Sequence, residues 1–245
     1  KENKYDDDIF FQKYSQMSRS QQGLAGAGEW ETLRKLLPDF KDKRVLDLGC
    51  GYGWHCIYAM EHGASSVVGV DISHKMLEVA KEKTHFPQVE YKCCAIEDVE
   101  FPEESFDVIL SSLAFHYVAD YEILVKKIYR ILKSGGKLVF TVEHPVFTAY
   151  GTQDWYYNEK GEILHFPVDN YYYEGKRTAV FLGEKVTKFH RTLTTYLNTL
   201  LSNGFIINHI VEPQPPENMM DIPGMRDEMR RPMMLIVSAN KKVDR

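Results

Sequence analysis

Apolar residues recur along the middle of the chain in two alternating patterns. Short continuous apolar runs predict buried strands, and longer runs with apolar residues three or four positions apart predict amphipathic helices. The predicted strands are 44–49, 66–71, 89–95, 106–112 and 137–143. The predicted helices between them are 54–63, 74–83 and 121–136. Strands separated by helices of this length indicate crossover connections and a parallel sheet covered by helices on both faces.

Two segments interrupt this alternation. Residues 1–43 predict a helical N-terminal extension with a middle rich in Gly and Ala. Residues 144–190 form an insertion after the fifth strand, and ten of the forty residues from 150 to 189 are aromatic, against 13% of the whole chain. This density excludes a flexible linker. Within the insertion, 177–189 predicts a hairpin that turns at Gly183.

The alternation resumes after the insertion with a helix over 192–204 and strands over 205–212 and 232–239. We therefore expect an α/β, Rossmann-like fold with a seven-stranded, mostly parallel sheet and helices on both faces. The expected parts are the extension 1–43, a core of 44–143 and 191–240, and the insertion 144–190 as a substrate cap.

Composition and charge narrow the classes of function. A formal net charge of -5 argues against a protein that binds nucleic acid over a broad basic surface. The four cysteines form no CxxC pair and no zinc-finger spacing with histidine, so we expect reduced thiols and no metal. No run approaches the roughly 20 apolar residues that span a membrane, and the N-terminal residues lack a signal-peptide core. We expect a cytoplasmic monomer or homodimer that acts on a small molecule, without nucleic-acid or membrane partners.

The first predicted strand ends in a glycine-punctuated turn, in the sequence VLDLGCGYG. A dinucleotide-binding turn needs a third glycine where Trp54 stands here, and the indole is too bulky for the close packing of helix on strand. Asp47, before the glycines, is unfavourable beside a pyrophosphate but suits a ligand that carries an ammonium group. Asp71, at the end of the next strand, can accept both hydroxyls of a ribose. These residues disfavour an NAD-dependent oxidoreductase and favour another adenosine compound.

An acid before a G-x-G-x-G turn and a second acid at the tip of the next strand are the defining pair of the class I S-adenosylmethionine-dependent methyltransferases. The stretch VLDLGCGYGWHCIYA closely resembles the first motif of this family, and the chain resembles its members with a type 11-like domain. The resemblance extends over roughly residues 40–142 and includes the segments 93–118 and 128–142. It implies S-adenosyl-L-methionine as the cofactor and methyl donor, with S-adenosyl-L-homocysteine as the product.

The resemblance also implies a set of cofactor-binding positions. Asp71 would hold the ribose hydroxyls, and Tyr14 of the extension could reach the methionyl end of the cofactor. The family often has Asp at the adenine edge, where this chain has Ala95, so the adenine amino group would be recognised by backbone, by Glu97 or by Asp98. The expected cofactor-binding residues are Tyr14, Asp47, Gly49, Cys50, Gly51, Asp71, Ile72, Met76, Ala95, Ile96, Glu97, Ser111 and Leu113.

Three histidines are candidates for a general base. His116 and His144 follow the fourth and fifth predicted strands, and His190 lies where the insertion rejoins the core. Histidine suits proton transfer near neutral pH, although each of the three could instead be structural and hydrogen-bonded to backbone. Glu143, beside His144, is either a further candidate or an orienting carboxylate. Methyl transfer depends mainly on alignment and exclusion of water, so the reaction does not require a base or a metal.

The aromatic insertion has two interpretations: a roof over a small organic acceptor, or a satellite core or dimer contact. The expected function is methyl transfer to an O or N atom of a small organic acceptor. The alternatives are a protein, peptide or nucleic-acid methyltransferase, and a catalytically silent S-adenosylmethionine-binding module. The sequence SSLAFHY replaces the Asp/Asn-Pro-Pro-aromatic motif of adenine-N6 enzymes, and the chain has no Pro-Cys dipeptide, which argues against nucleic acid.

Overall fold

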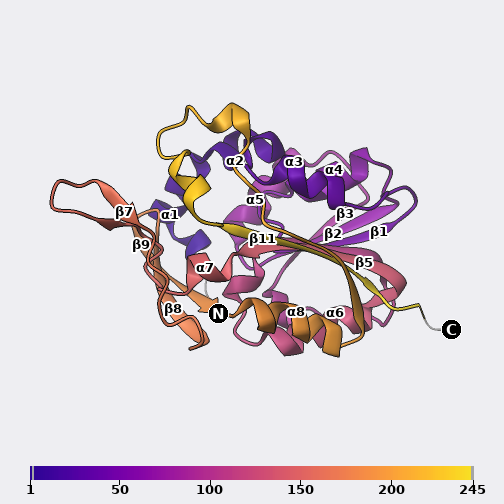
Figure 1. Cartoon of the computed structure of the whole chain (residues 1–245). Helices are drawn as coiled ribbons and strands as arrows, with labels where there is room; N and C mark the ends of the chain where they lie inside the picture. The colour runs from indigo at the N-terminus through magenta and orange to yellow at the C-terminus, as the bar shows by residue number, and fades with distance from the viewer. Residues whose placement is uncertain (2, 244–245) are drawn as a thin grey trace.

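Seven strands form one mixed sheet at the centre of the protein, in a computed structural model that describes residue 1 and residues 3–243 (Figure 1). The strand order is β10-β11-β5-β4-β1-β2-β3, in which β11 runs antiparallel to both of its neighbours and the other pairs are parallel. The order reverses between β1 and β4, so ligands are expected at the carboxyl ends of these strands. The strands are β1 (Arg44–Leu48), β2 (Ser66–Asp71), β3 (Val89–Cys93), β4 (Phe106–Ser112), β5 (Leu132–Glu143), β10 (Phe205–Val211) and β11 (Met234–Lys241).

Helices cover both faces of this sheet and enclose two apolar cores (Figure 1). Successive side chains of a strand point to opposite faces, and in β1 Val45 packs into one core while Leu46 and Leu48 pack into the other. The predicted seven-stranded α/β fold is therefore confirmed. One face carries α3 (Trp30–Leu33), α4 (Trp54–Glu61) and α5 (His74–Lys83), and the other α6 (Tyr121–Ile131) and α8 (Leu193–Ser202).

One predicted boundary is wrong. The helical pattern of 121–136 continues to Gly136 in the sequence, but α6 ends at Ile131 and β5 already begins at Leu132. Leu132 pairs with Phe106 of β4, and its carbonyl accepts a hydrogen bond from the Lys241 ammonium at 2.8 Å. Sheet pairing and burial thus override a helical pattern that local sequence alone favours.

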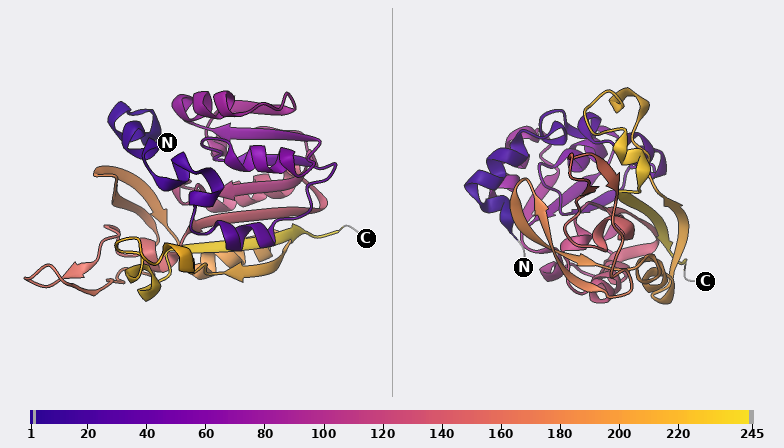
Figure 2. Two further views of the ribbon diagram at one scale, coloured as in Figure 1. Left: turned by 90° about the horizontal axis from the view of Figure 1, so that it is seen from above. Right: turned by 60° about the vertical axis from the view of Figure 1, so that its left-hand side comes forward.

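The extension and the insertion lie together at one end of the sheet (Figure 2). The predicted hairpin is confirmed as β8 and β9, which turn at Leu182 and Gly183. The extension comprises η1 (Lys4–Asp6), α1 (Asp8–Ser15), α2 (Ser18–Gln21) and η2 (Gly23–Gly26). The insertion comprises α7 (Pro145–Thr148), β6 (Tyr156–Tyr157), β7 (Ile163–His165), β8 (Gly175–Phe181) and β9 (Glu184–His190). The remaining short turns of 3-10 helix are η3 (Arg34–Leu36), η4 (Ile96–Asp98), η5 (Phe115–Tyr117), η6 (Glu217–Met219) and η7 (Asp227–Arg230).

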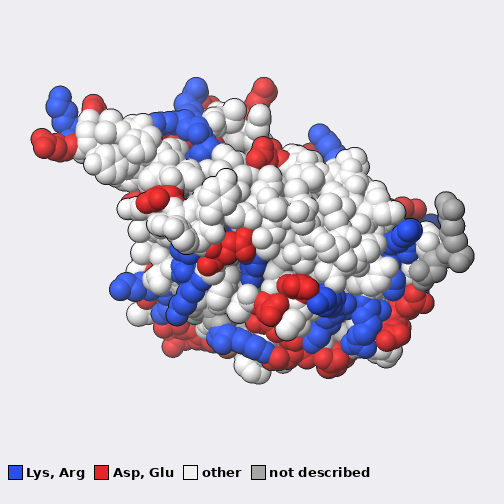
Figure 3. Space-filling model, turned by 60° about the horizontal axis from the view of Figure 1, so that its bottom comes forward, with Lys and Arg blue, Asp and Glu red and all other residues white. Residues whose placement is uncertain are grey.

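Charge is distributed unevenly over the surface. The side of the molecule below the sheet shows a broad area without Lys, Arg, Asp or Glu (Figure 3). The segment 192–211, which forms α8 and the edge strand β10, contains none of these four residue types. Among the described residues, no helix combines the length and the apolar character that a membrane crossing requires.

Candidate active site

A cavity of about 310 Å³ lies at the carboxyl edge of the sheet, beneath the N-terminal extension. Its lining residues follow or end five successive strands: Gly49 after β1, Asp71 at the end of β2, Ala95 after β3, Ser112 at the end of β4 and Glu143 at the end of β5. The cavity lining includes these sequence-predicted residues: Tyr14, Gly49, Gly51, Asp71, Ile72, Met76, Ala95, Ile96, Glu97, Leu113 and His116.

The glycine turn forms the floor of the cavity. The amides of Gly49 and Cys50 both donate to the Val70 carbonyl, at 2.8 and 2.9 Å, which ties the turn to β2. Gly49 has φ +80, and a Cβ there would lie 2.4 Å from the Cβ of Ala114. Gly51 has φ +52, and a Cβ there would meet nothing within 4 Å. Packing therefore requires glycine at position 49, whereas at position 51 the bare backbone faces the open cavity.

Asp71 stands beside this turn and is held by backbone. One carboxylate oxygen accepts from the Gly51 amide at 2.9 Å, and the other accepts from the Ser73 amide at 2.9 Å. Burial raises the pKa of Asp71, although both of these hydrogen bonds oppose the shift. Each carboxylate oxygen can accept more than one hydrogen bond, so Asp71 retains capacity for two hydroxyl donors from the cavity.

Asp47 lies beneath the turn rather than in the cavity lining. Its side chain is buried, and Oδ2 accepts a long hydrogen bond of 3.5 Å from the Cys56 thiol. Oδ1 has no hydrogen-bond partner among the described residues. Burial raises the pKa of Asp47 to about 7. An orphaned carboxylate oxygen beside the turn fits the ammonium group of an amino-acid moiety, so these residues fit S-adenosylmethionine.

The opposite wall of the cavity is apolar. Ile72, Met76, Ala95 and Ile96 line it together, and Ile96 also approaches the glycine turn. Of the two acids considered for the adenine amino group, only Glu97 lines the cavity. Apolar lining residues together with one acid suit a purine ring.

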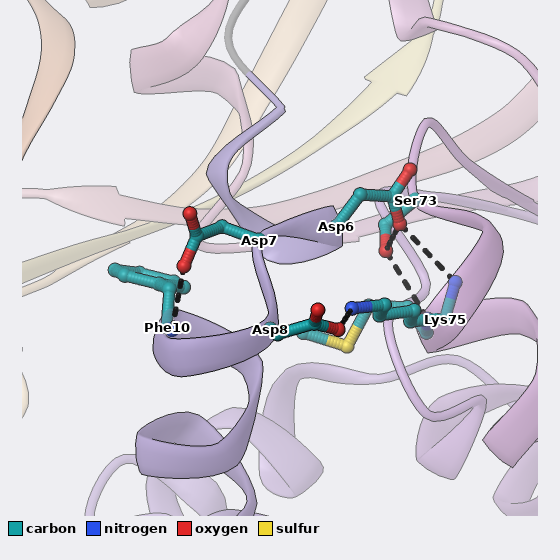
Figure 4. A network of polar contacts seen from close by, with 7 residues as sticks. Asp6, Asp7, Asp8, Phe10, Ser73 and Lys75 are labelled. Atoms are coloured by element: carbon teal, nitrogen blue, oxygen red, sulfur yellow. Dashed lines mark hydrogen bonds and ion pairs between the residues drawn. The ribbon is translucent and has the colours of Figure 1, made fainter.

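The N-terminal segment, whose Tyr5 lines the cavity, is joined to the start of α5 by a network of polar contacts (Figure 4). One carboxylate oxygen of Asp6 accepts from the Ser73 hydroxyl at 2.6 Å and from the Lys75 amide at 3.2 Å, at the start of α5. Asp8 forms an ion pair with the Lys75 ammonium. Asp7 instead caps its own helix, because its carboxylate accepts from the Phe10 amide at 3.0 Å. The segment is therefore attached directly to the loop that follows Asp71.

Arg19 of α2 is a site residue that sequence reasoning missed. Its guanidinium donates to both carboxylate oxygens of Glu29 at 2.9 Å. Arg19 and Tyr14 line both the main cavity and a smaller adjoining cavity of about 70 Å³, which Cys50 also lines. A cation at this position can meet the carboxylate of an amino-acid moiety whose ammonium group lies near Asp47.

The far end of the cavity contains the side chains that can meet an acceptor. Glu143 and His116 line it together with Phe181 of the β8–β9 hairpin. The Glu143 amide donates to Nδ1 of His116 over a long 3.4 Å, which places the proton of the neutral ring on Nε2. Burial lowers the pKa of His116 to about 4, so its ring is neutral at pH 7.

The other two candidate histidines lie outside the cavity lining. His144 caps α7, because its Nδ1 accepts from the Val146 amide at 3.1 Å, and its Nε2 lies 2.8 Å from the Glu212 carboxylate. His190 is buried between the Thr148 hydroxyl, at 2.7 Å from Nδ1, and a backbone carbonyl on its Nε2 side. Both side chains are thus engaged in holding the insertion, and the geometry favours His116 over either of them for contact with an acceptor.

One further predicted position, Ser111, also lies behind the cavity wall. The Ser111 hydroxyl is buried and donates to the Leu48 carbonyl at 2.7 Å. Leu113 does line the cavity, with φ +53. The lining residues that the sequence did not single out are Lys1, Tyr5, Met17, Arg19, Ser112, Ala114, Tyr117, Val118, Phe181, Met233 and Met234.

Comparison with known proteins gives the same assignment as the geometry. A family model described as a methyltransferase domain matches residues 46–140. A provisionally assigned S-adenosylmethionine-dependent methyltransferase from Listeria monocytogenes has a crystal structure that matches with a TM-score of 0.86 and 57% identity, over 90% of this chain and 99% of that chain. The crystal structure of an S-adenosylmethionine-dependent methyltransferase from Mesorhizobium loti matches with a TM-score of 0.82 and 41% identity, over 89% and 100% of the two chains.

Curated sequences add two further relatives. An uncharacterized protein of Haemophilus influenzae is 34% identical over 97% of this chain and 96% of its own length. A ubiquinone biosynthesis O-methyltransferase of Coxiella burnetii is 36% identical, but the match spans only 45% of this chain and 47% of that enzyme. With the glycine turn, the two acids beside it and solved relatives that match along nearly the whole chain, this protein belongs to the class I S-adenosylmethionine-dependent methyltransferases.

Proposed function

We propose that the protein transfers a methyl group to an O or N atom of a small organic acceptor. The observation that carries this proposal is the continuity of one cavity, which runs from Gly49 and Asp71 to Glu143 and His116 and is covered by the N-terminal segment. A volume of about 310 Å³ is at the lower end of small-molecule sites, which supports a small acceptor.

The residues have distinct roles in this proposal. When bound, S-adenosylmethionine supplies an electrophilic methyl group on a positively charged sulfur. Asp71 would hold the ribose hydroxyls, while Asp47 and Arg19 would hold the two charged groups of the amino-acid moiety. His116, neutral at pH 7, would donate from Nε2 and orient the acceptor. Catalysis would then rest on alignment and exclusion of water rather than on a base.

The insertion would serve as the cap over the acceptor mainly through its β8–β9 hairpin. Phe181 of this hairpin lines the cavity, whereas Phe166 stacks against Phe147 and lies edge-on to Trp155. Tyr172 and Tyr173 are exposed. Different rings of the insertion would therefore have different roles, with one at the cavity and the others in packing or at the surface.

Calorimetry with S-adenosylhomocysteine and with NAD tests the cofactor half of the proposal. We expect binding of the former and none of the latter. Release of S-adenosylhomocysteine during incubation with a panel of small amines and hydroxyl compounds tests the acceptor half. Cofactor binding without turnover on any small compound, but with turnover on a peptide or nucleic acid, would contradict the small-acceptor proposal.

A further inference from the structure

The acceptor end of the cavity presents a single formal charge, that of Glu143, among the described residues. The other charged residues of the lining lie in the cofactor half. Lys1 pairs with Asp98 beside η4, and Arg19 pairs with Glu29 near the glycine turn. The rest of this end consists of aliphatic, thioether and aromatic side chains, including Tyr5 and Tyr117, whose hydroxyls lie 3.3 Å apart, and the neutral His116. An acceptor therefore meets one negative charge in apolar surroundings.

Glu143 is held in place and kept ionised. Its Oε1 accepts from the Lys188 ammonium at 2.6 Å, and its Oε2 accepts from the Gln153 amide at 2.5 Å. Although burial alone would raise the pKa of Glu143, His116 and Lys188 lower it below its ordinary value. A carboxylate has about four acceptor positions, and 12% of the Glu143 side chain remains accessible. The carboxylate thus keeps acceptor positions available to a ligand.

The positive partner of Glu143 is enclosed. The Lys188 side chain is 3% exposed and does not line the cavity. Its ammonium also donates to the Gln153 carbonyl oxygen at 2.8 Å and lies 5.4 Å from the centre of the Phe181 ring. Lys188 therefore fixes the carboxylate from outside the cavity, and a ligand meets the carboxylate and the aromatic ring.

The acid strength of these groups decides between two roles for Glu143. A general base works best when its pKa lies near the working pH. The pKa of Glu143 lies below its ordinary value, and that of His116 is about 4, so neither is suited to take a proton at pH 7. A carboxylate that is ionised at pH 7, and whose ion-pair partner is enclosed outside the cavity, is instead suited to bind a cation with N–H donors.

We propose that Glu143 anchors a protonated amino group of the methyl acceptor while a different O or N atom of the same molecule, with a free lone pair, receives the methyl group, so that the acceptors are small amines and carboxylic acids are excluded. This inference rests on the proposed function, because it assigns the substrate class of the same cavity. Glu143 is a binding residue in this scheme, and Lys188 and Gln153 are positioning residues that act through it.

Matched ligands test the inference by binding rather than by turnover. Calorimetry would use protein saturated with S-adenosylhomocysteine and two sets of probes, each with an amine, a neutral compound and an acid of similar size. The first set is tyramine, 4-ethylphenol and 4-hydroxyphenylacetate. The second set is butylamine, butanol and butanoate. We expect an amine to bind most tightly within a set and the acid most weakly. Glu143→Gln should weaken amine binding by about 10- to 100-fold, because it replaces a charge-assisted hydrogen bond with a neutral one.

Lys188→Met separates an anchoring role from a purely structural one. It removes one of the two groups that hold the Glu143 carboxylate, but the Gln153 amide still donates to Oε2, so amine binding should weaken far less than in Glu143→Gln. If the pair only holds the insertion in place, both variants should lose binding alike. Glu143→Gln leaves the Lys188 charge buried and unpaired, which can prevent folding. In that case the double variant Glu143→Gln/Lys188→Met, which removes both charges, is tested in place of the single variant.

Three results would overturn the inference: an acid or neutral probe that binds more tightly than the amine of its set, amine binding that is unchanged in Glu143→Gln, or no binding of any probe to protein that binds S-adenosylhomocysteine. Failure of the wild-type protein to bind S-adenosylhomocysteine would instead contradict the proposed function.

Discussion

Replacing Asp47 with asparagine removes a carboxyl group whose ionisation is unfavourable in the folded protein, because the side chain is buried. Burial raises the pKa of this carboxyl from 3.8 to about 7; a hydrogen bond from the Cys56 thiol opposes the shift and the Asp71 carboxyl adds to it. Between these two values the folded protein keeps a proton on Asp47 that the unfolded chain has lost. A raised carboxyl pKa therefore contributes stability that is fully present below the unfolded value and is lost as the pH rises through the folded value.

The magnitude follows from the two pKa values. The difference between 3.8 and about 7 corresponds to about 4 kcal/mol of unfolding free energy, at ~1.4 kcal/mol for each tenfold change. About 2–3 kcal/mol of this loss should occur between pH 5 and pH 8. The Asp47→Asn variant lacks the ionisation, so its stability relative to wild type should improve by that amount over the same interval. The cost of burying the asparagine amide is present at both pH values and cancels from the comparison.

Urea unfolding of the ligand-free proteins at pH 5 and pH 8 measures this difference. Asp107→Asn is a matched control, because hydrogen bonds and charges from Arg44 and Lys133 outweigh the effect of burial and hold the pKa of Asp107 below its ordinary value. Removing that carboxyl should give the same stability difference at both pH values. An Asp47→Asn difference that is likewise independent of pH would show that Asp47 is ionised throughout, and the reasoning would fail.

Three other changes test the site. Asp71→Ala should weaken S-adenosylhomocysteine binding by about 1–3 kcal/mol in calorimetry, because it removes a charge-assisted acceptor; unchanged affinity would mean that other groups hold the ribose. Gly49→Ala should lower the melting temperature more than Gly51→Ala, since only the former places a Cβ 2.4 Å from Ala114, and equal melts would contradict this. At saturating cofactor, titration of His116 should cause no change in kcat near pH 6.5, because burial lowers the pKa of His116 to about 4. A step in kcat near pH 6.5 that is present in the wild type and lost in His116→Gln would contradict this.

Much of the fold was predictable because its strands are short apolar runs between well-marked turns. The error at the end of α6 shows the limit. Leu132 continues the helical spacing of its predecessors, and only the neighbouring strand, with Phe106 as partner, makes it part of β5. Local sequence contains the helix signal but not the position of β4.

The grouping of the glycine turn and Asp71 at one cavity was predictable for a related reason. Gly49, Gly51 and Asp71 belong to consecutive strand ends, so a single stretch of sequence places them together. Contacts between distant segments were not predictable: Arg19 reaches the glycine turn from the extension, and Lys188 reaches Glu143 across 45 positions. One signal was available for Lys188, since it occupies an inward-facing position of β9, in alternation with buried neighbours two residues away on either side.

The attachment of the N-terminal segment has a consequence for how long a bound molecule stays. The segment holds the start of α5 through Asp6 and Asp8, and it holds the β8–β9 hairpin through Lys4, which lies 3.4 Å from the Glu184 carboxylate. Exposed ion pairs of this kind weaken as salt screens them, over a distance of about 10 Å at 0.1 M. We therefore expect that higher ionic strength shortens the residence time of a bound molecule through the contacts of residues 4–8, whatever chemical group that molecule carries.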